Sequence, residues 1–151
     1  MSRTVLITGA SQGIGEGLAH AFAAEGCPLH LTARSADKLD ALKRAIEAEH
    51  RVAVGVTAID MTQDGACERI VEEAGDVDIL INNAGVIPSG SLFDIGAQRW
   101  REGWALKGFG YADMIRDLGR KSQLIVITHN RATMAAADNY RGASCRALPW
   151  R

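Results

Sequence analysis

The fold of this chain is decided by residues 4–15, which read TVLITGASQGIG. An apolar and β-branched run, Val5–Thr8, ends abruptly at Gly9, and apolar residues at helical spacing begin at Leu18. This order predicts a strand, a glycine-rich turn and a helix. A helix start offers unpaired backbone N–H groups and partial positive charge, so the turn suits a phosphate group.

The three glycines of this turn have separate expected roles. We expect Gly9 to adopt backbone angles that are closed to other residues. Gly13 lets a pyrophosphate approach the main chain without a Cβ in the way, and Gly15 lets the helix pack close to the strand. The alternative is a turn that binds nothing, because a glycine triplet is a weak signal and the spacing Gly-x-x-x-Gly-x-Gly departs from the commoner Gly-x-Gly-x-x-Gly.

The composition limits the class of protein. The 151 residues suit one domain, and 17 basic against 18 acidic residues give a net charge of -1, which argues against a nucleic-acid or membrane-attracting face. No signal-peptide pattern opens the chain and no apolar run approaches a membrane span, so we expect a cytoplasmic protein. The cysteines, Cys27, Cys67 and Cys145, are widely spaced and suit neither a disulfide framework nor a zinc site, so we expect no bound metal.

Further strands alternate with helices along the chain. We expect them at residues 28–33, 51–57, 76–81 and 124–128, with helices between them that include residues 100–118. This alternation predicts βαβ units and an α/β fold with a parallel sheet. We assign residues 1–129 to a single domain of this fold, whose glycine turn we expect to bind a dinucleotide. Residues 130–151 show no clear periodicity and are expected to form a loosely ordered tail.

Ligands of such sheets lie beyond the carboxyl ends of the strands, so the residues after each strand are candidates. Arg34 follows the second strand, where a basic side chain accepts a 2′-phosphate and favours NADP(H) over NAD(H); the alternative is a solvated arginine. Asp60 follows the third strand and either accepts from an adenine amino group or caps a helix. Asn82–Gly85 follow the fourth strand, and the paired asparagines either bridge neighbouring strands beside a flat cofactor or form an ordinary turn.

Together these segments resemble the signature of the short-chain dehydrogenase/reductase family: the glycine loop of residues 8–15, then Asp60, then Asn82-Asn83-Ala84-Gly85. The resemblance covers residues 3–128. It implies a doubly wound, Rossmann-type parallel sheet of about five strands in the order 3-2-1-4-5, with helices on both faces. It also implies hydride transfer between NADP(H), with NADPH preferred over NADH, and a small-molecule alcohol or carbonyl substrate. The cofactor-binding residues that it implies are Gly9, Ser11, Gly13, Ile14, Gly15, Arg34, Asp60, Met61, Asn83, Ala84 and Gly85.

The catalytic positions match the family less well. Carbonyl reduction needs a proton donor, which in the family is a tyrosine whose pKa is lowered by a lysine four residues later. Tyr140 lies at about the right distance past the fifth expected strand, but Ser144 stands in place of the lysine. Thr128 or His129 stands where the family has a serine. Lys107 stands where the family has an asparagine, and is either a substitute cation or a solvated helix lysine.

Two functions from different classes therefore remain open, beside a third hypothesis of a chain fragment that folds poorly and binds nothing. The first is an NADP-dependent oxidoreductase with Tyr140 as proton donor, which the resemblance favours. The second is an NADP(H)-binding module, truncated or catalytically impaired, that lacks the Tyr-x-x-x-Lys pair. The aromatic residues of the 100–118 helix supply either a homo-oligomer surface or ordinary core packing.

Overall fold

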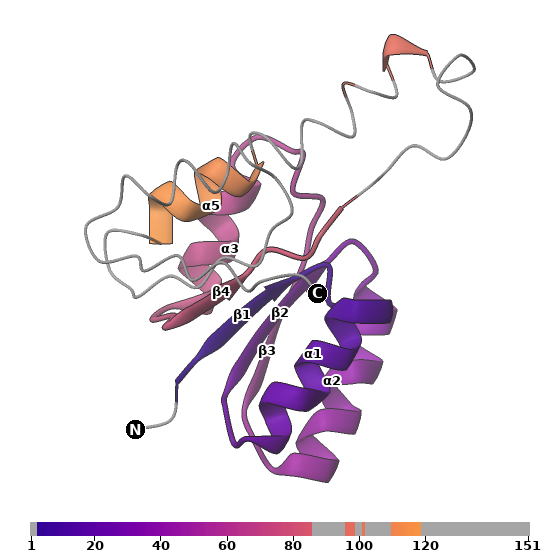
Figure 1. Cartoon of the computed structure of the whole chain (residues 1–151), viewed down its shortest axis with the longest axis vertical. Coiled ribbons are helices and arrows are strands. Elements are labelled where there is room, and N and C mark those ends of the chain that lie inside the picture. Colours follow the sequence, from indigo (N-terminus) through magenta and orange to yellow (C-terminus); the bar gives the residue numbers. More distant parts are fainter. Residues whose placement is uncertain (1–2, 86–95, 99–100, 102–109, 119–151) are drawn as a thin grey trace, which may run out of the picture.

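The computed structural model describes residues 3–85, 96–98, 101 and 110–118 of the chain (Figure 1). The described elements are β1 (Val5–Thr8), α1 (Gly13–Ala24), β2 (Leu29–Ala33), α2 (Ala36–His50), β3 (Val54–Ala58), α3 (Ala66–Ala74), β4 (Ile79–Ile81) and α5 (Tyr111–Leu118). Strands and helices alternate from β1 to β4, which confirms the predicted α/β fold.

The four strands form one parallel sheet in the order β3-β2-β1-β4. β1 lies inside the sheet, where Val5 pairs with Leu29 on β2 and with Ile79 on β4. The parallel sheet and the order of its first four strands are as predicted. The expected fifth strand, residues 124–128, lies outside the described residues, as does the boundary at residue 129 between domain and tail.

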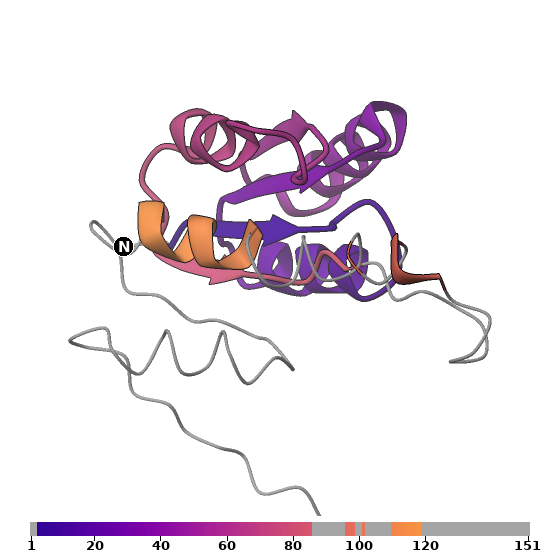
Figure 2. The same cartoon turned by 90° about the horizontal axis from the view of Figure 1, so that it is seen from above.

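Helices cover both faces of the sheet, because side chains alternate along each buried strand. Val5 and Ile7 of β1 pack with residues of α1 and α2, whereas Leu6 between them packs with residues of α3 and α5. Figure 1 shows α1 and α2 side by side, and Figure 2 shows α3 and α5 next to each other at one side of the molecule. This two-sided cover gives the doubly wound architecture.

The third strand begins later than the sequence predicted. Residues 51–57 were expected to be extended, but β3 begins at Val54. Arg51 instead adopts the left-handed conformation, with φ of 58°, and its N–H donates to the carbonyl oxygen of Glu47 at 3.2 Å. The first residue of the expected strand therefore ends α2 rather than starting a strand.

The fourth strand is also shorter than predicted. Residues 76–81 were expected to be extended, whereas β4 covers Ile79–Ile81. Asp78 lies just before it, where its carboxylate accepts from the N–H of Thr4 at 2.8 Å. The expected helix over residues 100–118 is confirmed in its last part by α5, and residues 102–109 lie outside the described residues.

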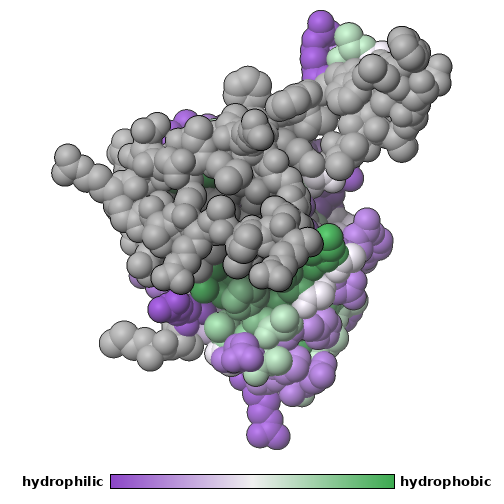
Figure 3. Space-filling model, in the orientation of Figure 1, coloured by the Kyte–Doolittle hydropathy of each residue, from purple (hydrophilic) through white to green (hydrophobic). Residues whose placement is uncertain are grey.

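Hydrophilic side chains cover much of the described surface in the face shown by Figure 3, and apolar ones gather in a band beside the grey atoms. Among the described residues, Ile14 is the large apolar side chain that stays exposed, at 76%. No helix in this part of the chain has the length and apolar character needed to cross a membrane.

A chain of polar side chains links β2, β3 and α3. The Thr57 hydroxyl donates its single proton to Glu73 Oε2 at 2.6 Å, so it accepts from His30 Nε2 at 2.8 Å. This fixes the tautomer of His30 with the proton on Nε2. The other ring nitrogen lies against Gly55, where an added Cβ would come within 2.6 Å of it. Burial lowers the pKa of His30, and the nearby Glu73 carboxylate opposes this only in part.

This arrangement predicts a pH-dependent stability. Because the folded-state pKa of His30 is below the ordinary value of 6.5, the unfolded chain binds the proton more readily, and the free energy of unfolding falls as pH drops below about 6.5. Urea unfolding of the parent and of His30→Gln between pH 7.5 and 5.5 measures this effect. The variant should lose part of the slope, at most about 1.4 kcal/mol per pH unit. Equal slopes in the two proteins would contradict the prediction.

Candidate functional site

The glycine-rich turn joins β1 to α1 at the carboxyl edge of the sheet (Figure 1). Gly9 has φ of 66° and Gly13 has φ of 62°. L side chains rarely adopt such positive values. The prediction for the backbone of Gly9 is therefore confirmed, and Gly13 carries the same constraint.

The turn is closed on one side and open on the other. A Cβ added to Gly9 would lie 2.7 Å from Ala84 Cα, and a Cβ added to Gly15 would lie 2.3 Å from the Gly9 carbonyl oxygen. A Cβ added to Gly13 would meet nothing within 4 Å. Gly9 thus allows the turn to pack closely on the segment after β4, and Gly15 allows α1 to pack closely on the turn. Gly13 faces open space.

The start of α1 has no side-chain cap. Gln12 occupies the cap position with extended backbone, and its side chain makes no capping hydrogen bond. Its Oε1 instead accepts from Lys38 Nζ, in the first turn of α2, at 2.9 Å. The exposed backbone at Gly13 and Ile14 therefore combines uncapped N–H groups, the positive end of the helix dipole and a nearby ammonium group. Such a helix start can bind an anion.

A polar junction joins the ends of β1 and β4. The Thr8 hydroxyl accepts from the backbone N–H groups of Asn83 and Ala84, both at 3.0 Å. The Asn83 side-chain Nδ2 donates to the carbonyl oxygens of Thr8 at 3.2 Å and Gly9 at 3.1 Å. Asn83 therefore bridges neighbouring strands, which confirms the bridging part of the first alternative for one of the two asparagines.

Arg34, Asp60 and Met61 follow the next two strands at the same edge. Arg34 is exposed directly after β2. Hydrogen bonds from the backbone N–H and the hydroxyl of Thr62 lower the pKa of Asp60, and the positive charge of Arg34 lowers it further. Asp60 does not cap α3, whose cap position is Gly65. The Met61 side chain is buried in the core, so we expect a ligand to meet its backbone first.

Of the other predicted residues, Ser11 is half-buried in the turn, and Gly85 is exposed just after the junction. All eleven predicted cofactor residues lie within the described residues. The four predicted catalytic residues, Lys107, Thr128, His129 and Tyr140, lie outside them.

Sequence reasoning named Thr8 and Asn82 only as members of longer motifs, and it missed Thr32 altogether. The position of Thr8, directly before the glycine turn, is the sequence feature that could have indicated its role in the junction. Asn82 is 2% exposed, and neither its side-chain oxygen nor its nitrogen has a hydrogen-bond partner among the described residues. The fully buried Thr32 hydroxyl is likewise unpaired in this part of the chain. Asn82 was visible as the first residue of the asparagine pair, whereas nothing local marks Thr32.

Tyr111, at the start of α5, belongs to the core. It is 3% exposed, its hydroxyl donates to the Ala84 carbonyl oxygen, and burial raises its pKa to about 12. Core packing, one of the two alternatives for the 100–118 helix, thus holds for this aromatic residue. The other aromatic residues on which the predicted homo-oligomer surface depends lie outside the described residues.

Comparison with known proteins adds a family match. The family model described as short chain dehydrogenase matches residues 3–132. The 3-dehydrosphinganine reductase TSC10A of Arabidopsis thaliana is 38% identical over 91 residues, which cover 60% of this chain and 28% of the plant protein. The 2,3-dihydro-2,3-dihydroxybenzoate dehydrogenase of Bacillus subtilis is 27% identical over an alignment that covers 94% of this chain and 60% of that protein.

A solved structure shows the same fold. A short-chain dehydrogenase from Sphingobium yanoikuyae, solved in complex with NADPH, superposes with a TM-score of 0.72 and is 36% identical in sequence. The superposition covers 78% of this chain and 47% of that protein. The chain thus spans between 28% and 60% of the length of the relatives named here.

The junction yields a prediction for stability. Thr8→Val keeps the shape of the side chain but leaves the N–H group of Ala84 without its acceptor, whereas the N–H group of Asn83 keeps the Ile81 carbonyl oxygen at 3.1 Å. Unsatisfied buried groups cost about 1–3 kcal/mol each, so the free energy of unfolding should fall by at least about 1 kcal/mol. Chemical denaturation of the purified variant measures the loss.

Thr32→Val is the matched control, because it removes a buried hydroxyl that has no partner among the described residues. We expect this second variant to be as stable as the parent or more so. The proposed importance of the junction is wrong if both threonine variants lose the same free energy.

Proposed function

Because the chain belongs to the short-chain dehydrogenase/reductase family, we propose that it binds NADP(H) at the glycine turn and transfers a hydride between this cofactor and an alcohol or carbonyl substrate. The chain's own part is to hold the dinucleotide along the carboxyl edge of the sheet. The bound nicotinamide would supply or accept the hydride.

The observation that carries this proposal is the open side of the turn at Gly13. The turn is closed on one side by the close packing of Gly9 and Gly15, and on the other side it offers uncapped N–H groups, with open space beside Gly13. A pyrophosphate fits this combination, since its oxygens accept from N–H groups and its charge is favoured by the helix dipole. The positive φ of Gly13 favours glycine at this position, and the open space beside it leaves room for the ligand.

The basic side chains near the turn support NADP(H) over NAD(H). Arg34 lies where the second strand ends, and its guanidinium offers the planar fork of donors that suits a 2′-phosphate. Lys38 adds a second positive charge beside the helix start, through its hydrogen bond to Gln12. The NADPH found in the Sphingobium yanoikuyae relative is consistent with this preference.

The remaining cofactor contacts follow the strand ends in order. Asp60, ionised and held by Thr62, would accept from the adenine amino group, with the backbone of Met61 beside it. Asn83, Ala84 and Gly85 would form the floor beneath the cofactor, because the junction with Thr8 holds this segment against the turn.

For the proton that accompanies the hydride, we propose Tyr140. The chain has two tyrosines, and the buried Tyr111, with its pKa raised to about 12, is unsuited to give up a proton near neutrality. Thr128 or His129 would hold the carbonyl group, and Lys107 would supply the cation that the family takes from a lysine four residues after its tyrosine.

One sequence observation favours a second candidate, an NADP(H)-binding module without turnover. Ser144 stands four residues after Tyr140 and cannot lower the pKa of a phenol as a lysine does. Both candidates require the same cofactor site, so cofactor binding is tested first and turnover second.

Fluorescence titration of the purified chain with NADPH and with NADH tests the cofactor site. We expect tighter binding of NADPH. Arg34→Ala should weaken NADPH binding by roughly 10- to 100-fold, since a hydrogen bond to a charged group contributes about 1.5–3 kcal/mol. The same variant should leave NADH binding unchanged.

Arg44→Ala is the matched control, because Arg44 is an exposed arginine within α2 and away from the strand ends. It should bind NADPH as the parent does. A chain that binds neither dinucleotide would overturn the proposed site, and equal loss of NADPH and NADH binding in Arg34→Ala would overturn the role of this arginine.

A second measurement separates the two candidates. NADPH oxidation is followed with a panel of aldehydes and ketones, for the parent and for Tyr140→Phe. An active enzyme should lose most of its turnover in the variant while keeping its affinity for NADPH, because the hydroxyl acts only as proton donor. Unchanged turnover in the variant would exclude Tyr140, and tight NADPH binding without turnover in the parent would favour the binding module.

A further inference from the structure

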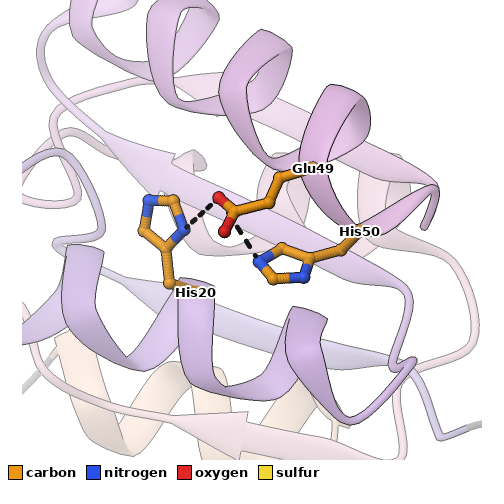
Figure 4. Close-up of side chains that lie close together, drawn as sticks. All are labelled: His20, Glu49 and His50. Carbon is orange, nitrogen blue, oxygen red and sulfur yellow. Dashed lines mark ion pairs between the residues drawn. The ribbon is translucent and has the colours of Figure 1, made fainter.

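A cluster of three side chains lies between α1 and α2. His20 comes from the middle of α1, and Glu49 and His50 come from the last turn of α2. Figure 4 shows the two imidazole rings on either side of the Glu49 carboxylate, each aimed toward it. Among the described residues, this is the one group of three or more histidine, cysteine or carboxylate side chains whose ligand atoms converge closely enough for a metal ion.

The distances fit a shared ion. His20 Nδ1 lies 3.8 Å from Glu49 Oε2, and His50 Nε2 lies 3.6 Å from the same oxygen. The three ligand atoms, one from each residue, all lie within 4.8 Å of one another. Ligands at about 2.0–2.1 Å from a tetrahedral ion are about 3.4 Å apart, so small side-chain rotations bring all three to bonding distance.

The surroundings favour a cation over an empty cluster. His50 is the last residue of α2, where unpaired carbonyl groups and the helix dipole give partial negative charge. The side chains of His20 and Glu49 are 37% and 63% exposed, so an ion can enter from solvent and keep a water molecule as a further ligand. The ring of His50 is less exposed, at 18%, which limits its motion.

We propose that His20, Glu49 and His50 form a binding site for a borderline divalent cation of the Zn²⁺ type, which links α1 to α2. Two imidazole nitrogens with one carboxylate oxygen suit Zn²⁺, Ni²⁺ or Cu²⁺, whereas Mg²⁺ and Ca²⁺ prefer oxygen ligands alone. This proposal departs from the expectation, based on cysteine spacing, that the chain binds no metal. No local pattern indicates the site, because His20 and Glu49 lie 29 positions apart in the sequence.

The site is separate from the proposed cofactor site. His20 lies seven residues along α1 from Gly13, which corresponds to about 10 Å along the helix axis. Metal binding is therefore expected both with and without NADPH, and its failure would leave the proposed cofactor site untouched.

Isothermal titration calorimetry with ZnCl₂ tests the site on the full, untagged chain after treatment with EDTA. We expect saturation at one ion per chain and no comparable binding of MgCl₂. His20→Ala and His50→Ala should each weaken Zn²⁺ binding by about tenfold or more, because each removes one of three protein ligands. Zn²⁺ should also raise the melting temperature of the parent but not that of the two variants, since only a bound ion stabilises the folded chain.

Three further variants distinguish the proposed ligands from nearby side chains that can also bind a metal. Glu49→Gln keeps the size of the side chain and should lose most of the affinity. Asp40→Asn removes an exposed carboxylate of the same helix, and Cys27→Ser removes a half-buried thiol; both should bind Zn²⁺ as the parent does. Circular dichroism checks that all variants remain folded.

The proposal is overturned if the parent does not bind Zn²⁺, if both histidine variants bind it unchanged, or if Cys27→Ser is the variant that loses it. In the first two cases the three side chains form ion pairs only.

Discussion

The hydrogen bonds between the ends of β1 and β4 are the constraint on which the site depends. The Thr8 hydroxyl accepts hydrogen bonds from two backbone N–H groups about 75 residues later in the chain. The Asn83 side-chain amide donates two hydrogen bonds to the carbonyl oxygens of Thr8 and Gly9, at the start of the turn. These bonds hold Ala84 so close to Gly9 that no side chain fits between them. Glycine at this position is therefore a consequence of strand pairing as well as of the positive φ.

The same junction decides which side of the turn is available to a ligand. The backbone of Gly9 packs directly on Ala84, and that of Gly15 packs on Gly9, so this side of the turn is closed to a ligand. The open side of the turn is then the one where Gly13 leaves space. The positive charges of Arg34 and Lys38 lie on the residues that follow β2 and begin α2, which is the charge that the proposed NADP(H) site requires.

The parts of this site that could be predicted from the sequence are those with a local signal. Val5–Thr8 before a glycine turn, and Asn83 after a buried strand, are short patterns whose partners follow from the parallel sheet. The predicted start of the third strand was wrong because Arg51 adopts the left-handed conformation that ends α2. The residue types in this segment do not indicate where the helix ends. The burial of the Asn82 side chain without a hydrogen-bond partner in the described part of the chain, and the cluster around Glu49, arise from tertiary packing and could not be inferred from spacing.

Two side-chain contacts at different heights join α1 to α2. Near the start of both helices, Lys38 of α2 donates to Gln12, the cap residue of α1. Farther along, Glu49 of α2 lies between His20 and His50. The distance between the glycine turn and Arg34 is set within the sheet, where β1 pairs with β2 and the N–H of Ala10 donates to the carbonyl oxygen of Thr32 at 3.2 Å. A cation bound by the cluster would therefore stabilise the packing of α1 on α2 without changing the position of the turn relative to Arg34, which agrees with the separation of the two proposed sites.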